Sequence, residues 1–152
     1  MIHRIKLLND FKEVQKLYEF IKQFPLDYPD YFIWLEKCKR QLELNEKRAV
    51  YATLDNEIIG DVIFQNLKED TTVLEIKNFR VAEPHRNLGV GSALESMLYS
   101  FAKSNGFKKI QADTHQDSLG MIQFLIKRGY SIESQETLYT LNKQEIILSK
   151  KL

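Results

Sequence analysis

The sequence from residue 81 to residue 94 reads VAEPHRNLGVGSAL, and the rest of the chain is best interpreted outward from it. A strand is expected to end there, a proline turn follows, and Gly89 and Gly91 lead into a helix expected over 92–104. Glycine has no Cβ, so the backbone can approach a ligand closely. The first N–H groups of a helix lack intrahelical acceptors and carry the positive end of its dipole. The stretch therefore predicts a phosphate-binding loop, with the charge of Arg86 beside it.

Two well-known phosphate signatures do not fit this loop. A dinucleotide fingerprint needs a third small residue where the chain has Leu94. A P-loop needs a lysine after its last glycine, whereas Gly91 is followed by Ser92 and Ala93. A glycine-rich helix start that binds no ligand stays an open alternative, because two glycines make a short motif.

The elements on either side are predicted from periodicity, with apolar residues three or four apart indicating helices and alternation indicating strands. Helices are expected over 11–24, 31–45, 92–104 and 118–128. Strands are expected over 2–8, 50–54, 58–64, 73–81, 109–115, 130–140 and 144–148, with turns at Asp55-Asn56 and around Asn142. The order β-α-α-β-β-β-α-β-α-β-β predicts an α/β fold of the α+β type. Its central sheet is mixed, since only the crossovers require parallel pairing, and helices flank it.

Length and charge limit the function classes. The chain has 152 residues, which fits a single domain over 1–152 with a full hydrophobic core. Twenty-two Lys and Arg oppose twenty-one Asp and Glu, so the formal net charge is +1. Nucleic-acid binders usually carry a basic excess, and its absence here argues against a nucleic-acid partner.

Cysteine and histidine are scarce. A single cysteine, Cys38, excludes an intramolecular disulfide, and its place on the apolar face of a helix favours a buried, unreactive thiol. Three histidines, His3, His85 and His115, are too few for an obvious zinc site, so we expect no metal. The first residues turn charged too early for a signal peptide, and no apolar run reaches the roughly 18 residues of a membrane span. We expect a cytoplasmic protein with no membrane partner.

Residues 86–91, RNLGVG, resemble the Arg/Gln-x-x-Gly-x-Gly/Ala signature of the GCN5-related N-acetyltransferases, the GNAT family. The strand at 74–81 stands where the family has its fourth strand, and FLIKRGY at 124–130 is similar to the family's Phe-Tyr-x-Lys-x-Gly-Phe segment. The element order also matches, so the resemblance covers essentially the whole chain. It implies a GNAT-like fold and acetyl-CoA as cosubstrate. The implied reaction is acetyl transfer to a primary amine of a small molecule or protein, by direct attack in a ternary complex.

The resemblance also implies cofactor-binding residues. Backbone groups of Phe79, Arg80 and Val81 would pair with the pantetheine arm, and an N–H near Val81 would stabilise the oxyanion of the thioester. Ser118 stands where the family often has asparagine. The loop and helix start would bind the pyrophosphate through Arg86, Asn87, Leu88, Gly89, Val90, Gly91, Ser92 and Ala93.

The catalytic residues are less well defined. Leu125 stands where the family often has the tyrosine that protonates the leaving thiolate, and leucine has no proton to give. Tyr130, Tyr139 and His115 are candidate replacements for that acid. Glu75 is the first candidate for the general base that deprotonates the amine, and His115 is the second. A chain of water molecules stays open as the base, as do purely structural roles for Glu75 and His115.

Two other functions stay open. Leu125 is also compatible with a non-catalytic acyl-CoA-binding sensor or partner-binding module. A toxin or regulator that acetylates a macromolecule is the other, although the near-neutral charge argues against a tRNA substrate. The aromatic segment with Tyr28, Tyr31, Phe32 and Trp34 is a candidate for substrate contact or for core packing. A homodimer is also left open.

Overall fold

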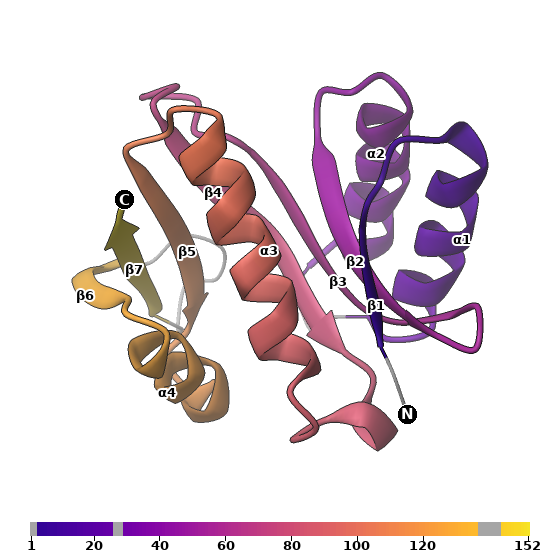
Figure 1. The fold of residues 1–152 in the computed structure, drawn as a ribbon. Coiled ribbons are helices and arrows are strands. Elements are labelled where there is room, and N and C mark those ends of the chain that lie inside the picture. The colour runs from indigo at the N-terminus through magenta and orange to yellow at the C-terminus, as the bar shows by residue number, and fades with distance from the viewer. Residues whose placement is uncertain (1–2, 26–28, 137–143) are drawn as a thin grey trace. The chain divides into compact units, whose positions relative to one another are not determined.

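The computed structural model describes residues 3–25, 29–136 and 144–152 (Figure 1). Apart from a short 3₁₀ helix, the element order is the predicted one. The elements are β1 (Arg4–Leu7), α1 (Phe11–Lys22), α2 (Tyr31–Glu43), β2 (Arg48–Leu54), β3 (Glu57–Asn66), β4 (Val73–Val81), η1 (Glu83–His85), α3 (Val90–Ser104), β5 (Lys109–His115), α4 (Leu119–Lys127), β6 (Ser131–Glu136) and β7 (Glu145–Lys151). The α/β fold class is therefore confirmed.

The strands form a seven-stranded mixed sheet in the order β1-β2-β3-β4-β5-β7-β6. Strands β4 and β5 pair in parallel, from Val73 opposite Lys109 to Ile76 opposite Ala112. The pairs β1–β2, β2–β3, β5–β7 and β6–β7 are antiparallel. The final strand β7 thus lies between β5 and β6, whereas the sequence predicted only that β6 and β7 form a hairpin. The predicted turn at Asn142 lies outside the described residues.

The packing of the chain divides it into two compact units. The first comprises Met1–Gln65 and Lys77–Leu98, and the second comprises Asn66–Ile76 and Tyr99–Leu152. Strand β4 contributes to both units, because its first four residues belong to the second unit and its last five to the first. The single domain over 1–152 stays a prediction.

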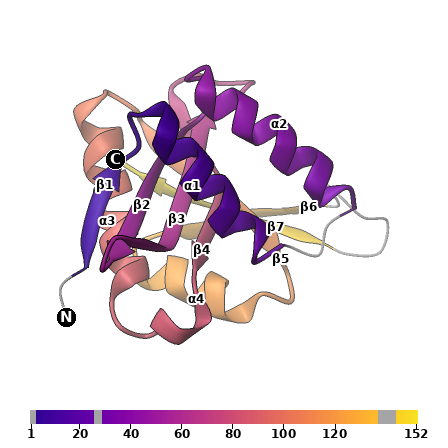
Figure 2. The same ribbon diagram turned by 90° about the vertical axis from the view of Figure 1, so that its right-hand side faces the viewer.

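The core of the first unit lies between two helices and the strands. Helices α1 and α2 lie side by side over one face of the strands of this unit, as Figures 1 and 2 show. The cluster buried there includes Leu17 of α1, Leu35 and Cys38 of α2, and Ala49 and Ile63 of the strands. Cys38 is fully buried, and burial raises the pKa of its thiol to about 12. The predicted burial of Cys38 is confirmed. A protonated buried thiol is a poor nucleophile, so we expect Cys38 to be unreactive.

The second unit is built around β5. Ile110 of β5 and Leu148 of β7 are fully buried, and Leu125 of α4 is 1% exposed. Gly106 and Gly129 follow α3 and α4 with φ of 77° and 96°, the left-handed conformation that commonly ends a helix. Both helix ends were predicted from these glycines. No helix in the described ranges is long and apolar enough to cross a lipid bilayer.

Several element bounds differ from the sequence prediction by one to three residues, and β7, for example, ends at Lys151 rather than at residue 148. Helix α3 begins at Val90 rather than at residue 92, because Val90 is buried and anchors the first turn in the core. The turn at Pro84 is a 3₁₀ helix over Glu83–His85, with proline near its start, where no N–H is needed. Strand β2 begins at Arg48, two residues before the predicted start. The tight turn at Asp55-Asn56 is confirmed by left-handed φ values of 50° and 67°.

Candidate cofactor-binding site

The predicted phosphate loop is an exposed turn between η1 and α3. Asn87 and Gly89 both have left-handed backbones, with φ of 63° and 85°. A Cβ built on Gly89 would meet no atom within 4 Å, so the glycine is required by its backbone conformation and not by crowding. The residues 86–89 are exposed, and Val90, which follows, is buried. The loop therefore presents open backbone to solvent directly in front of the helix.

The start of α3 supplies the N–H donors. The amides of Val90, Gly91 and Ser92 belong to the first helical turn and lie before the intrahelical hydrogen-bonding pattern begins. The Ala93 amide already donates to the Gly89 carbonyl at 3.0 Å. The N–H group of Ala93, which the sequence predicted as a donor to the ligand, is therefore already used within the helix.

Arg86 is exposed and folds back toward the preceding strand. Its Nε donates to the Val81 carbonyl at 2.9 Å. This bond fixes the side chain across the end of β4 and keeps its positive charge beside the loop. It also occupies one of the backbone groups that the resemblance assigns to the pantetheine arm.

The last residues of β4, Phe79–Val81, are half-buried and held closely by β3. The Ala82 amide donates to the Ile59 carbonyl at 2.8 Å. A Cβ on Gly60 would lie 2.9 Å from the Arg80 carbonyl and 3.1 Å from Leu94 Cδ1, so any larger residue would displace this segment. Sequence reasoning missed Gly60, although a glycine inside a strand is a known sign of close backbone approach.

A second residue that sequence reasoning missed is Asp61, which lies in the middle of β3 and has no exposed surface. Its Oδ2 accepts a 3.0 Å hydrogen bond from Nδ2 of Asn78 on β4. The Tyr31 hydroxyl of α2 donates to Asn78 Oδ1 at 3.4 Å. Burial raises the pKa of Asp61 to about 7, against the lowering effects of Asn78 and Arg80. The available signal was a lone carboxylate in the apolar run IIGDVIF at 58–64.

The aromatic segment is partly in the core. Tyr31 is 6% exposed and stacks on Trp34, with ring centroids 5.4 Å apart, whereas Phe32 is 53% exposed. Burial raises the pKa of the Tyr31 hydroxyl, and the Asp61 carboxylate raises it further. Tyr28 and the candidate acid Tyr139 lie outside the described residues.

The catalytic candidates Glu75, His115 and Tyr130 all belong to the second unit. Glu75 is half-buried and lies opposite Gln111 in the β4–β5 ladder. His115 ends β5, with its Nδ1 3.5 Å from Oε1 of the buried Glu145. The Ser118 amide donates to the His115 carbonyl at 2.9 Å, so Ser118 and His115 share one turn.

Tyr130 lies apart from His115. It is 2% exposed, its ring lies 5.5 Å from Nζ of Lys150, and Lys150 pairs with Ile110 near the start of β5. His115 is five residues further along β5, which at ~3.3 Å per residue corresponds to roughly 16 Å. The contact of Tyr130 with Lys150 thus places it near a residue paired with the start of β5, whereas His115 ends that strand.

Leu125 belongs to the core. Its side chain is 1% exposed and its carbonyl accepts from the Tyr130 amide at 3.0 Å. The position at which the family often has an acid is thus a packing position in this chain.

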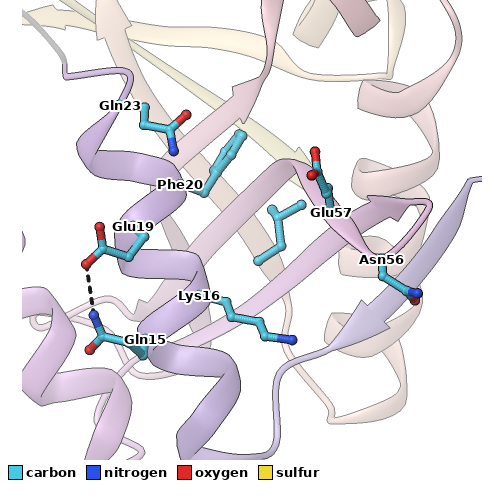
Figure 3. Close-up of a pocket in the computed structure, with 8 residues that line it drawn as sticks. Gln15, Lys16, Glu19, Phe20, Gln23, Asn56 and Glu57 are labelled. Carbon is cyan, nitrogen blue, oxygen red and sulfur yellow. Dashed lines mark hydrogen bonds between the residues drawn. The ribbon is translucent and has the colours of Figure 1, made fainter.

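A surface hollow of about 390 Å³ lies elsewhere in the first unit, between α1 and the β2–β3 turn (Figure 3). Six of its eight lining residues are of polar type, and one pair, Gln15 and Glu19, is hydrogen-bonded at 2.9 Å. None of the predicted site residues lines it. The lining residues are Gln15, Lys16, Glu19, Phe20, Gln23, Asn56, Glu57 and Ile58.

In the described part of the chain, no group of three or more His, Cys, Asp or Glu side chains is arranged to hold a metal ion.

The fold and the loop together define a class of proteins with a mixed sheet and a glycine loop that leads into a helix after the fourth strand. Residues 11–130 match the sequence model of the acetyltransferase (GNAT) family. The match covers well over half of the chain, so the chain belongs to this family. Its enzyme class is acetyltransferase, and the resemblance inferred from the RNLGVG loop is confirmed.

Solved structures agree on the fold. A GNAT-family protein from Desulfovibrio desulfuricans superposes with a TM-score of 0.85 at 14% identity, covering 99% of each chain. The ribosomal-protein-S18-alanine N-acetyltransferase from Escherichia coli gives 0.77 at 15% identity, covering 99% of this chain and 94% of that one. A Bacillus anthracis protein described as a streptothricin acetyltransferase, in complex with acetyl coenzyme A, gives 0.64 at 22% identity, covering 70% and 63%. No curated protein sequence is significantly similar to the chain.

Proposed function

We propose that the chain transfers an acetyl group from acetyl-CoA to a primary amine of a small molecule or protein, by direct attack in a ternary complex. The observation that carries the proposal is the loop before α3. Gly89 is left-handed with open space on its side-chain face, and the first N–H groups of the helix follow directly. An exposed helix start of this kind suits a pyrophosphate, and the family supplies the identity of the cofactor.

The chain's own residues would bind and align the cofactor. The donors at Val90, Gly91 and Ser92 and the charge of Arg86 would bind the pyrophosphate. The backbone of Phe79–Val81, held rigidly by the close approach of Gly60, would align the pantetheine arm. Acetyl-CoA supplies the activated thioester. Holding the amine in attacking geometry against it supplies much of the rate enhancement.

Proton transfer is assigned to residues of the second unit. Glu75 is the proposed base, directly or through water, with His115 as the alternative. Tyr130 and His115 are the candidate acids and Ser118 is a proposed cofactor contact. The thiolate leaves readily near neutral pH because thiol pKa values lie near 8.5. A buried leucine at the usual acid position is therefore compatible with catalysis.

The class of amine substrate is the least constrained part of the proposal. One structural neighbour acts on the alanine of ribosomal protein S18 and another is described as a streptothricin acetyltransferase. Both a protein amine and a small amine thus occur on this fold. A cytoplasmic location and a homodimer stay predictions.

The test is thermal unfolding with acetyl-CoA, CoA and ATP in parallel. A ligand at a hundredfold excess over its Kd stabilises the folded state by about 2.7 kcal/mol, a shift of a few degrees for a chain of this size. We expect a rise with both CoA species and none with ATP. No rise with either CoA species would overturn the proposal.

Turnover is then measured as release of CoA thiol with a panel of amines. Release with at least one amine supports acetyl transfer. Because Leu125 is buried and supplies no acid, the competing function is a non-catalytic acyl-CoA sensor. Binding of acetyl-CoA without turnover of any amine or protein substrate would favour that sensor.

A further inference from the structure

The buried carboxyl group of Asp61 is unusual in its setting. It lies among apolar residues in the centre of β3, between the buried residues Gly60 and Val62. Its Oδ2 accepts one hydrogen bond, from Asn78, and its Oδ1 has no hydrogen-bond partner among the described residues. Burying an unpaired carboxylate is costly, and a valine or isoleucine at the same position would avoid that cost. Such a residue requires an explanation other than packing.

Within the part of the chain that the structure describes, the acceptor left without a partner at this place is Asp61 Oδ1, and the groups around it are an amide, a phenol and a guanidinium. Asn78 directs its amide nitrogen toward Asp61 and its oxygen toward the Tyr31 hydroxyl. The charge of Arg80, further along β4, attracts the Asp61 carboxylate. On α2, Tyr31 and Cys38 are the titratable groups that sense the same charge. The Oδ1 atom of Asp61 can therefore accept from one further N–H donor, and the ionised carboxylate attracts a positive charge.

The position of the cluster relates it to the cofactor segment. Asn78 directly precedes Phe79–Val81 on β4, the residues assigned to the pantetheine arm. Asp61 directly follows Gly60, which lies against the backbone of the same segment. The cluster and the cofactor loop also belong to the same compact unit.

We propose that Asp61 is the residue that binds the positively charged amine of the substrate, with Asn78 and Tyr31 completing the site. The inference rests on the proposed function and names its substrate class as a protonated primary amine. Asp61 is enclosed in this structure, so the amine reaches it by displacing the Tyr31 side chain. The 3.4 Å hydrogen bond from Tyr31 to Asn78 is long and therefore weak, which eases that displacement.

The variant Asp61→Asn tests the inference because it removes the charge and keeps the shape. The matched control is Asp55→Asn, an exposed turn position with a left-handed backbone that asparagine also favours. The probes are putrescine, tyramine, kanamycin and a peptide with a free α-amine. We expect D61N to raise KM for the amine at least tenfold, with Kd for acetyl-CoA changed less than twofold. D55N should leave both unchanged.

The pH dependence provides a second readout. Only the ionised carboxylate attracts an ammonium, so KM for the amine should fall as pH rises through about 7. This dependence should be absent in D61N. The ionisation of the amine itself affects wild type and D61N alike, so a step near pH 7 in wild type alone distinguishes binding by Asp61 from a purely structural role.

The outcomes separate this inference from the proposed function. Failure of wild-type protein to bind acetyl-CoA, or to acetylate any probe, overturns both. A probe that reacts equally well with wild type and D61N overturns the role of Asp61 alone. If D61N fails to fold, the inference is tested on wild-type protein through the carbon-13 NMR signal of the Asp61 carboxyl group. Its titration midpoint should fall by at least one pH unit when an amine probe is bound, and an unmoved midpoint overturns the inference.

Discussion

The loop before α3 and the Asp61 cluster are two polar regions of the same compact unit, built on opposite principles. The loop uses backbone amides and left-handed residues, lies in solvent, and has few side-chain requirements. The cluster uses the side chains of Asp61, Asn78 and Tyr31, lies in the core, and depends on packing. A backbone site can bind any CoA-like ligand, whereas a side-chain site can select one substrate. This difference predicts that cofactor binding and amine recognition can be altered separately.

The largest expected effect concerns the stability cost of Asp61. Its pKa is raised from 3.8 to about 7 by burial, so the folded state favours the protonated acid. Because the folded protein holds this proton more tightly than the unfolded chain does, the free energy of unfolding falls as pH rises from about 4 to 7. Asp61→Asn should therefore stabilise the protein increasingly over that range, by on the order of 2–4 kcal/mol above pH 7.

The measurement is urea unfolding of wild type, D61N and D55N at pH 5, 6, 7 and 8. If the free energies of unfolding of wild type and D61N differ by the same amount at every pH, Asp61 is not a buried carboxyl group that titrates near pH 7. D55N controls for the general loss of one negative charge.

The next largest effect is at Gly60, which precedes Asp61 and lies against the backbone of Arg80 and Val81. In Gly60→Val, the side chain would meet the Arg80 carbonyl, since even a Cβ would lie 2.9 Å away. We expect a loss of about 1–3 kcal/mol of stability and weaker binding of acetyl-CoA. Gly120→Val is the control, because a Cβ on Gly120 meets nothing within 4 Å. Equal effects of G60V and G120V on acetyl-CoA binding would show that the close approach of β3 does not shape the cofactor segment.

A smaller effect is expected at Gly89. Gly89→Ala places a Cβ on a left-handed residue, at a cost of roughly 1–2 kcal/mol in the folded loop. We expect Kd for acetyl-CoA to rise several-fold. Gly106→Ala carries the same kind of strain at φ 77° after α3, again with open space, and should leave this Kd unchanged. Calorimetric titration of both variants measures the difference, and equal losses would argue against a phosphate site at the loop.

The smallest expected effect is that of Arg86→Ala. The guanidinium is exposed and donates to the Val81 carbonyl, so its removal costs little stability. We expect acetyl-CoA affinity to fall about two- to fivefold at low salt, with the difference shrinking at 0.5 M salt as charges are screened. A loss that does not depend on salt would indicate that Arg86 acts through its hydrogen bond to Val81 and not through its charge.

Much of the fold could be predicted because its signals are local. The glycines after α3 and α4, the Asp55-Asn56 turn and the stripes of apolar residues each report a backbone preference or a single buried face. The RNLGVG loop could be found for the same reason, since glycines and a following helix occupy consecutive positions. The start of α3 was misplaced by two residues because burial of Val90, a tertiary contact, extends the helix.

The catalytic candidates show the limit of this reasoning. Glu75, His115 and Tyr130 were chosen by residue type, and the structure gives each its own neighbour: Gln111, Glu145 and Lys150, respectively. The Glu145 partner of His115 could not be anticipated, because it depends on β7 pairing with β5.

The sequence by itself determined the element order, the family and the position of the glycine loop before α3, since all three depend on residues that are neighbours in the chain. Only the tertiary structure decided that Asp61 is buried beside Asn78 and Tyr31, and that Gly60 touches the backbone of Arg80. Those contacts join residues 17 to 47 positions apart. The pKa of a carboxyl group depends on what surrounds it in space, and the linear sequence does not contain that information.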